Sequence, residues 1–201
     1  SRIHGKEIPA AAKLAFEEIL EQRFALDVPA TDGWVGDETS PFSNRKLGIQ
    51  YPKIDVEKAF STAEVAVKRW RRSTVQDRVG VCMEILEQLS APAELFLNAH
   101  ATMHTAGQSF IMAYAGCGAN SLDRGLEAIA YAYKAMADVP ETAHWERRFG
   151  TGEPAALQKQ FRLMPRGVGV VITCATFPQW NGYPAILANL ATGNASIVKP
   201  H

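Results

Sequence analysis

Most of the chain before residue 140 carries apolar residues at helical spacing. They recur every three or four positions in four stretches, residues 9–24, 55–70, 74–107 and 121–136. This spacing places them on one face of a helix, so we predict four amphipathic helices that bury one face and leave the other in water. Two of the expected stripes are Val56, Phe60, Ala63, Val67 and Trp70, and Leu122, Leu126, Ile129, Tyr133 and Met136.

The ends of these helices are marked by residues of known preference. Asp55, Thr74 and Ser121 are expected to be N-caps, because their short polar side chains accept hydrogen bonds from free backbone N–H groups. Pro92 interrupts the third pattern, and Gly107 stops it.

Three other segments lack helical periodicity. Residues 27–53 are rich in Pro and Gly, which predicts a loop with one or two short strands, such as residues 47–50. Residues 144–154 are polar and contain Gly, so we interpret them as a linker. Residues 157–163 alternate between apolar and polar, apart from Lys159, which favours a strand.

The texture changes after residue 167. Residues 168–172 are apolar on both faces, which is typical of a strand covered on both sides in a parallel sheet. A short helix over residues 184–191, started by Pro184, and a strand over residues 195–198 would complete a βαβ unit. The fold class is therefore α/β. Gly167 and Gly169 precede the first strand, so they do not form a phosphate-binding loop.

Composition narrows the function. The 201 residues include 21 basic and 21 acidic side chains, and a net charge of zero argues against nucleic acid as a partner. The strongly apolar run 168–174 is too short to cross a bilayer, so no membrane partner is expected. Three cysteines favour a reducing, cytoplasmic setting. Because the chain begins with Ser1 and stops after an apolar run, we expect it to be a fragment of a longer protein.

Residues 164–201 carry a family resemblance. They read MPRGVGVVITCATFPQWNGYPAILANLATGNASIVKPH. This resembles the aldehyde dehydrogenase superfamily, whose usual text is PxGVVGVITPWNFP, then about one helix, then LAxGNxVVxKP. The match from Ile172 to Lys199 has no gap, and the upstream helices agree in order and character. Within the superfamily, TFPQWNGYP, KPH, TDGWVG and MHTAGQSF resemble the phenylacetate-degradation branch, PaaN.

The resemblance implies a domain plan. Residues 1–147 would be the helical N-terminal part of the cofactor domain, residues 155–164 an oligomerisation strand, and residues 165–201 the start of a doubly wound, Rossmann-like sheet. A homo-oligomer, dimer or tetramer, is therefore expected.

The resemblance also implies a cofactor site for NAD or NADP. Ligands of doubly wound sheets bind beyond the carboxyl ends of the strands, and Ile172 and Lys199 are both at such ends. The backbone of Ile172, Thr173, Cys174 and Ala175 is similar to the wall beside the dinucleotide. Lys199 resembles the lysine that contacts the adenine ribose.

The chain departs from the family at the oxyanion position. The family has Asn directly before Phe-Pro, and this chain has Thr176. Asn181 follows five residues later, which on a helix is about 140° away from the same face. If the region is an extended loop, Asn181 can fold back and serve as an alternative donor. Thr176 keeps a hydroxyl donor on a shorter arm.

The implied activity is NAD(P)-dependent oxidation of a small-molecule aldehyde to an acid through a cysteine thiohemiacetal. The branch implies a ring-opened semialdehyde of aromatic-acid breakdown, in the form of a CoA thioester. In the family, the nucleophile and the general base come after the Lys-Pro segment, so the fragment alone is expected to be inactive. One alternative is a non-catalytic nucleotide-binding or assembly module, and another is a helical scaffold without a ligand.

The remaining reactive residues have plainer interpretations. Cys174 is interpreted as a small apolar residue at a strand end, Cys82 as a core residue, and Cys117 as exposed in a Gly-rich turn. His100 and His104 have metal-compatible spacing on a helix, but no third ligand accompanies them. We therefore predict no metal site.

Overall fold

The computed structural model describes residues 7–24 and 26–201, and their elements alternate between long helices and short strands. In chain order they are α1 (Glu7–Ile19), β1 (Ala30–Val35), β2 (Tyr51–Ile54), α2 (Val56–Trp70), α3 (Val75–Leu89), α4 (Pro92–Ala106), α5 (Phe110–Ala113), the π-helix η1 (Tyr114–Ala119), α6 (Asn120–Ala137), β3 (Thr142–Arg147), β4 (Ala155–Gln160), β5 (Val168–Ile172), α7 (Pro178–Ala191) and β6 (Ala195–Lys199). The first six residues of the predicted N-terminal part, and Ala25, lie outside the described residues. Within the described part, no helix has the length and apolarity that crossing a bilayer requires.

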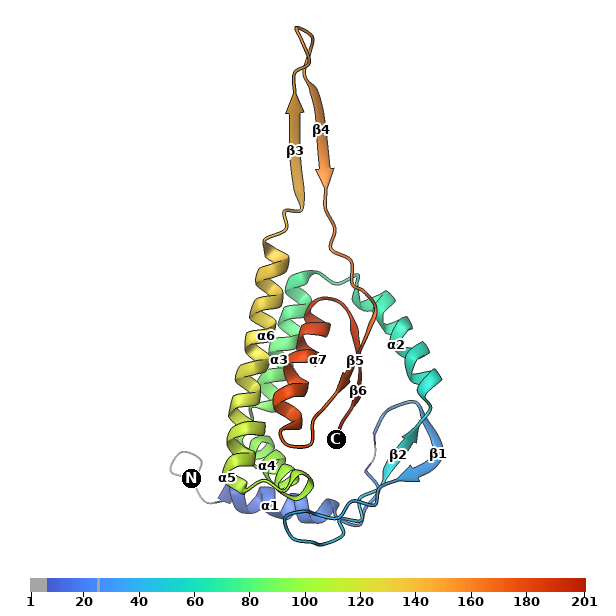
Figure 1. Ribbon diagram of the computed structural model, residues 1–201, viewed down its shortest axis with the longest axis vertical. Helices are drawn as coiled ribbons and strands as arrows, with labels where there is room; N and C mark the ends of the chain where they lie inside the picture. Colours follow the sequence, from blue (N-terminus) through green and yellow to red (C-terminus); the bar gives the residue numbers. More distant parts are fainter. Residues whose placement is uncertain (1–6, 25) are drawn as a thin grey trace.

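A core cluster lies where α3, α6 and α7 run side by side (Figure 1). Its buried members are Cys82, Leu86, Ile129, Leu187 and Ala191. Gly125 of α6 permits this close packing, because a Cβ there would lie 2.8 Å from Leu187 Cδ1 and 3.0 Å from Leu86 Cδ2. The interior prediction for Cys82 is confirmed, and burial raises the pKa of its thiol to about 11.

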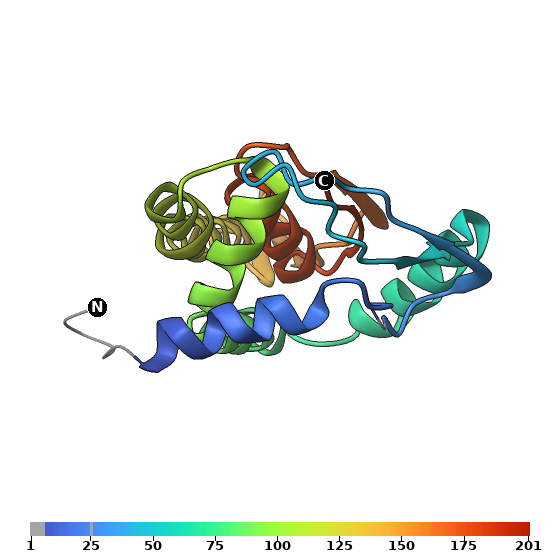
Figure 2. The same ribbon diagram turned by 90° about the horizontal axis from the view of Figure 1, so that it is seen from below.

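A second cluster joins α1 to α4, which lie along each other (Figure 2). Phe16, Leu47 and Ile49 are buried in it. The predicted strand over residues 47–50 is wrong: Gly48 has a φ of 64°, in the left-handed region, which breaks the extended backbone. The strand β2 follows it and pairs with β1 in an antiparallel sheet.

The predicted helices are present, but their number and ends differ. The first runs from Glu7 to Ile19 rather than over residues 9–24. The third is two separate helices, because Pro92 starts α4 instead of merely interrupting α3. Three of the predicted end signals are confirmed. Asp55 caps α2 through Lys58 N at 3.0 Å, Thr74 forms a capping box with Asp77, and Gly107 ends α4 with a φ of 73°.

The N-cap predicted at Ser121 is wrong. Residues before it are already helical in η1, so Ser121 is inside a continuous helix. Its buried hydroxyl donates to the carbonyls of Cys117 and Gly118, both at 2.7 Å. The helix therefore buries Ser121, Gly125 and Ile129, while Leu126 of the predicted stripe is 45% exposed.

The predicted linker over residues 144–154 is also wrong. It contains most of β3 and the turn that leads to β4, and the two strands pair antiparallel from Thr142↔Gln160 to Arg147↔Ala155. The predicted strand over residues 157–163 is present in part, since β4 begins at Ala155 and ends at Gln160. Figure 1 shows this hairpin projecting away from the helices.

The βαβ unit is confirmed: β5 and β6 are parallel and α7 connects them. However, α7 begins at Pro178, where a proline fits the first turn, and Pro184 lies inside the helix rather than at its start. The expectation that β5 is covered on both faces fails in this chain. Val171 is buried, but Val170 and Ile172 are 55% and 67% exposed, because side chains alternate between the two faces of a strand and α2 and α7, which both contact the strand pair, leave the face of Val170 and Ile172 open here.

Candidate functional site

The carboxyl ends of β5 and β6 form one edge of the parallel pair, as the sequence predicts. Ile172 is paired with Lys199 in the register of the two strands. Beyond that pair, Thr173 N donates to the Lys199 carbonyl at 3.1 Å, and His201 N donates to Thr173 Oγ1 at 2.9 Å. The segments that follow the two strands are therefore tied together at this edge, where ligands of doubly wound sheets bind.

The predicted wall residues are mostly open to solvent. Ile172, Cys174, Ala175 and Lys199 are exposed, and Thr173 is half-buried. An exposed apolar side chain beside backbone amides suits a flat aromatic ring, and the ammonium of Lys199 suits hydroxyl or phosphate oxygens. These residues therefore fit a nucleotide cofactor.

Asn181 folds back onto the end of β5. The residue is in the first turn of α7, and its side chain reaches seven to nine residues back along the chain. Its Oδ1 accepts from Cys174 N at 2.7 Å, and its Nδ2 donates to the Ile172 carbonyl at 3.3 Å. Both ends of the amide thus hold the backbone of the predicted wall.

Thr176 and Cys174 share the loop between β5 and α7. Thr176 Oγ1 lies 3.7 Å from Cys174 Sγ, and both side chains are exposed. Partial desolvation would raise the pKa of the Cys174 thiol, but hydrogen bonds from Phe177 N–H and from the hydroxyl and N–H of Thr176 outweigh it and lower the pKa below its ordinary value. Cys174 is thus the cysteine of this chain that is both exposed and easily ionised, beyond its interpretation as a small apolar residue.

The first turn of α7 is fixed by residues that sequence reasoning missed. Thr102 of α4 is within 3.4 Å of the Gln179 side chain, and the ring of Phe177 lies against Gly116 of η1. The predicted exposure of Cys117 is wrong, because it is 1% exposed beneath this turn. No spacing in the sequence links residues so far apart along the chain.

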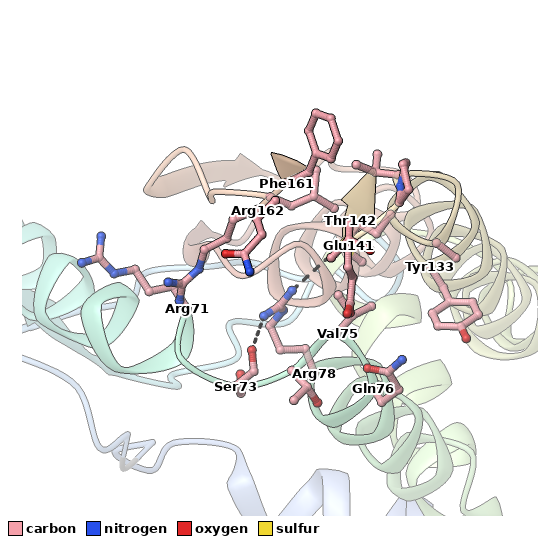
Figure 3. Close-up of a pocket in the computed structure, with 17 residues that line it drawn as sticks. Arg71, Ser73, Val75, Gln76, Arg78, Tyr133, Glu141, Thr142, Phe161 and Arg162 are labelled. Atoms are coloured by element: carbon pink, nitrogen blue, oxygen red, sulfur yellow. Dashed lines mark hydrogen bonds between the residues drawn. The ribbon is translucent and has the colours of Figure 1, made fainter. Parts of the chain in front are cut away.

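A pocket of about 720 Å³ lies elsewhere, at the base of the β3–β4 hairpin (Figure 3). It is bounded by the α2–α3 turn, the end of α6 and residues 160–163, and none of its lining residues belongs to the strand ends described above. Arg78 points into it but is engaged within the protein, donating to the Ser73 carbonyl at 2.6 Å and the Ala191 carbonyl at 3.0 Å. This pocket therefore lies at the junction between the hairpin and the helices.

His100 and His104 lie on α4, as predicted, but they face aromatic rings. The His104 ring stacks on Phe16 at 4.9 Å and its Nδ1 lies 3.1 Å from Ser40 Oγ, while the His100 ring is 4.8 Å from Phe110. In the part of the chain that the structure describes, no group of three or more His, Cys, Asp or Glu residues could hold a metal ion.

Comparisons with known proteins give the family. Residues 38–201 match the model of the aldehyde dehydrogenase family. The structure of an NAD-dependent aldehyde dehydrogenase from Burkholderia multivorans superposes with a TM-score of 0.91 and 42% identity, over 100% of this chain and 35% of that chain. A search of curated proteins found no match.

More distant structures share the fold. The 1-pyrroline-5-carboxylate dehydrogenase from Thermus with bound NAD has a TM-score of 0.68 and 17% identity, over 100% of this chain and 38% of that chain. The NADP-dependent glyceraldehyde-3-phosphate dehydrogenase from Bacillus halodurans C-125 has a TM-score of 0.62 and 19% identity, over 88% of this chain and 37% of that chain. The chain thus spans little more than a third of the proteins it resembles, corresponding to the N-terminal part of their fold. On the family match and the 42% identity, the chain belongs to the aldehyde dehydrogenase family.

Proposed function

We propose that this chain is the N-terminal portion of an NAD(P)-dependent aldehyde dehydrogenase that oxidises an aldehyde to its acid. The observation that carries the proposal is the edge formed by Ile172 and Lys199, in a chain of this family. The nucleophilic cysteine and the general base would belong to a longer protein. A thiolate would add to the aldehyde, and the bound nicotinamide supplies the hydride acceptor.

Binding of the cofactor falls to the ends of β5 and β6. The exposed face of Ile172 and the backbone of residues 173–175 would lie beside the dinucleotide, and the Lys199 ammonium would bind the ribose hydroxyls or a phosphate. Asn181 supports this arrangement because its amide holds the backbone at Ile172 and Cys174. Both NAD and NADP remain in this proposal.

The oxyanion donor is proposed to be Thr176, because it stands at the family's Asn position in the match without a gap, whereas the amide of Asn181 is held against the backbone of Ile172 and Cys174. A hydroxyl aimed at the aldehyde oxygen would stabilise the negative charge that develops there. Removing one such donor typically costs about a hundred- to a thousandfold in rate.

The test uses the longer protein that contains this chain, with an aldehyde and NAD+ or NADP+. Lys199→Ala should raise the Kd for the cofactor, while Lys159→Ala, on the distant hairpin, should not. Thr176→Val should lower kcat with little effect on cofactor binding. Thr176→Asn should keep kcat close to that of the parent protein. Cofactor binding without aldehyde oxidation would favour the alternative, a non-catalytic nucleotide-binding module of the same fold, for which Thr176 at the usual Asn position is the motivation. Absence of both would overturn the proposal.

The substrate is proposed to be a ring-opened semialdehyde, as a CoA thioester, of phenylacetate breakdown. Support comes from the wording TFPQWNGYP around the site, which resembles the PaaN branch. A comparison of kcat/KM for a CoA-linked semialdehyde with that for simple aliphatic aldehydes tests this, and a preference for the simple aldehydes would contradict it.

A homo-oligomer assembled through residues 155–164 completes the proposal. Each residue of β4 is exposed, Leu157 by 53%, and the strand pairs with β3 along one edge only. Pairing of that edge across subunits would satisfy its backbone groups. Sedimentation of the longer protein and of its Leu157→Lys variant tests this, since the variant should dissociate. We also place the protein in the cytoplasm, since its three cysteines are free thiols.

A further inference from the structure

The π-helix η1 interrupts an otherwise α-helical run from α5 to α6. Its six residues, Tyr114–Ala119, contain two glycines and one cysteine. A π-turn inserts an extra residue into a helix, and such turns are frequent at functional sites. Here the turn packs against α7, whose first residues follow the loop that carries Thr176.

Gly116 of η1 lies against Phe177, the residue that precedes α7. A Cβ at this position would lie within 2.5 Å of Phe177 Cδ1, a separation that real Cβ atoms essentially never show, and 3.3 Å from its Cζ. An aromatic ring cannot bend away, so a methyl group there would force the Phe177 side chain to rotate or one of the two backbones to move. Gly116 is therefore required for the present position of the ring.

Two further contacts hold the same turn. Thr102 of α4 and Gln179 of α7 are within hydrogen-bond distance at 3.4 Å. Burial raises the pKa of the Cys117 thiol, against hydrogen bonds from Thr102 and from the backbone of Gln179 and Trp180 that lower it. The first turn of α7 is thus packed onto α4 and η1 by both side chains and backbone.

The other end of the loop is equally fixed. Thr173 is bonded to β6, and Cys174 N to the Asn181 side chain. Ala175 and Thr176 lie between Cys174 and Phe177, and among the described residues they have no backbone hydrogen bond to another element. Their position therefore follows from where Phe177 is placed.

We propose that η1 fixes the position of the loop over residues 173–177, and that Gly116 is a positioning residue for Thr176. The inference rests on the proposed function in so far as Thr176 acts there as the oxyanion donor. Gly116 does not contact a substrate. It acts through Phe177. Because Gly116 has no side chain, it leaves room for the Phe177 ring, and the position of the ring fixes the Phe177 N–H and the preceding residue, Thr176.

Cys174 reports on this loop without any cofactor or aldehyde. Its thiol is exposed, while Cys82 and Cys117 are buried, so iodoacetamide should modify one thiol in the folded chain. The thiolate of Cys174 is favoured by the N–H of Phe177 and by Thr176, so displacement of Phe177 should weaken that support. The experiment measures the rate of alkylation of the 201-residue chain against pH, with intact mass to count the modified thiols.

Gly116→Ala should move the midpoint of the rate–pH profile to higher pH and slow alkylation at neutral pH severalfold. The matched control is Gly118→Ala in the same π-helix, where a Cβ would meet Leu95 at an ordinary 3.6 Å, and its profile should match the parent. Phe177→Leu should also raise the midpoint, because the loop loses the contact between the aromatic ring and η1. The double variant should return towards the parent profile, because the smaller side chain makes room for the added methyl group.

The outcomes separate clearly. Coincident profiles for Gly116→Ala and the parent would overturn the proposal, as would equal shifts for Gly116→Ala and Gly118→Ala. Modification of all three thiols would mean that Gly116→Ala has unfolded. Phe177→Leu and the double variant then decide. A midpoint that is raised in Phe177→Leu and returns towards the parent value in the double variant requires the contact between residues 116 and 177. Because no cofactor is involved, failure here is distinguishable from failure of the proposed activity. In the longer protein, Gly116→Ala should lower kcat more than it raises the Kd for NAD(P)+.

Discussion

The packed helices α3, α6 and α7 and the β3–β4 hairpin use apolar residues in opposite ways. Leu187 in the helical region is 2% exposed, whereas Leu157 in the hairpin is 53% exposed. The first region is stabilised by contacts between elements far apart in sequence, and the second by the backbone ladder of its two strands. A two-stranded hairpin is marginal by itself, so the two regions should respond differently to the same substitution.

The largest difference is expected from deletion of a leucine side chain. Leu187→Ala should lower the free energy of unfolding by about 2–5 kcal/mol, because it leaves a cavity beside Cys82 and Ile129. Leu157→Ala should change it by less than about 0.5 kcal/mol in the isolated chain. Urea unfolding followed by circular dichroism measures both, and equal losses would contradict the comparison.

A smaller difference is expected between two arginines that line the pocket at the base of the hairpin. Arg78→Met removes the donors to the Ser73 and Ala191 carbonyls, and a buried carbonyl left without a partner, as at Ala191, costs about 1–3 kcal/mol. Arg162→Met, exposed in the same pocket, should have little effect on stability. Urea unfolding measures both variants. A larger loss of unfolding free energy for Arg162→Met than for Arg78→Met would contradict the expectation that the buried arginine contributes more.

Next in size is the loss of a helix cap. Thr74→Ala removes the acceptor for Asp77 N and should cost about 1 kcal/mol. The control is Thr151→Ala, in the turn of the hairpin, which should be close to neutral. Thermal unfolding resolves the two variants, and an unchanged midpoint for Thr74→Ala would show that the capping box contributes nothing here.

The smallest difference is expected in pH dependence. Burial first, and then Arg45, lowers the pKa of His104 in the folded chain, with Glu17 opposing; burial, His104 and Lys13 lower that of His100. The unfolded chain therefore binds more protons below the ordinary value of 6.5, so this stability is fully present above that pH and is lost as the pH falls through the lower, folded pKa.

His104→Gln should flatten the fall in unfolding free energy between neutral and mildly acidic pH. Urea midpoints at several pH values measure this effect. Parallel slopes for His104→Gln and the parent would assign the acid sensitivity to other groups.

Local signals in the sequence were sufficient for several elements. The caps at Asp55 and Thr74 and the stop at Gly107 are decided within a few residues of each signal. The β5–α7–β6 unit follows from the order of its three elements, because a helical crossover joins parallel strands. Errors arose where two local signals competed. Both Pro178 and Pro184 suit a helix start, and only the backbone path shows that α7 begins at the first.

The sequence by itself determined the periodic elements, the balanced charge and the motif that ends in Lys199, because side-chain spacing and residue chemistry are read along the chain. The tertiary structure alone decided that Cys117 is buried, that residues 144–154 belong to a hairpin, that Asn181 bonds the end of β5, and that Gly116 admits Phe177. The physical reason is distance along the chain: Gly116 and Phe177 are brought together by the paths of α6 and α7, and no periodicity relates residues whose contact depends on how whole helices pack.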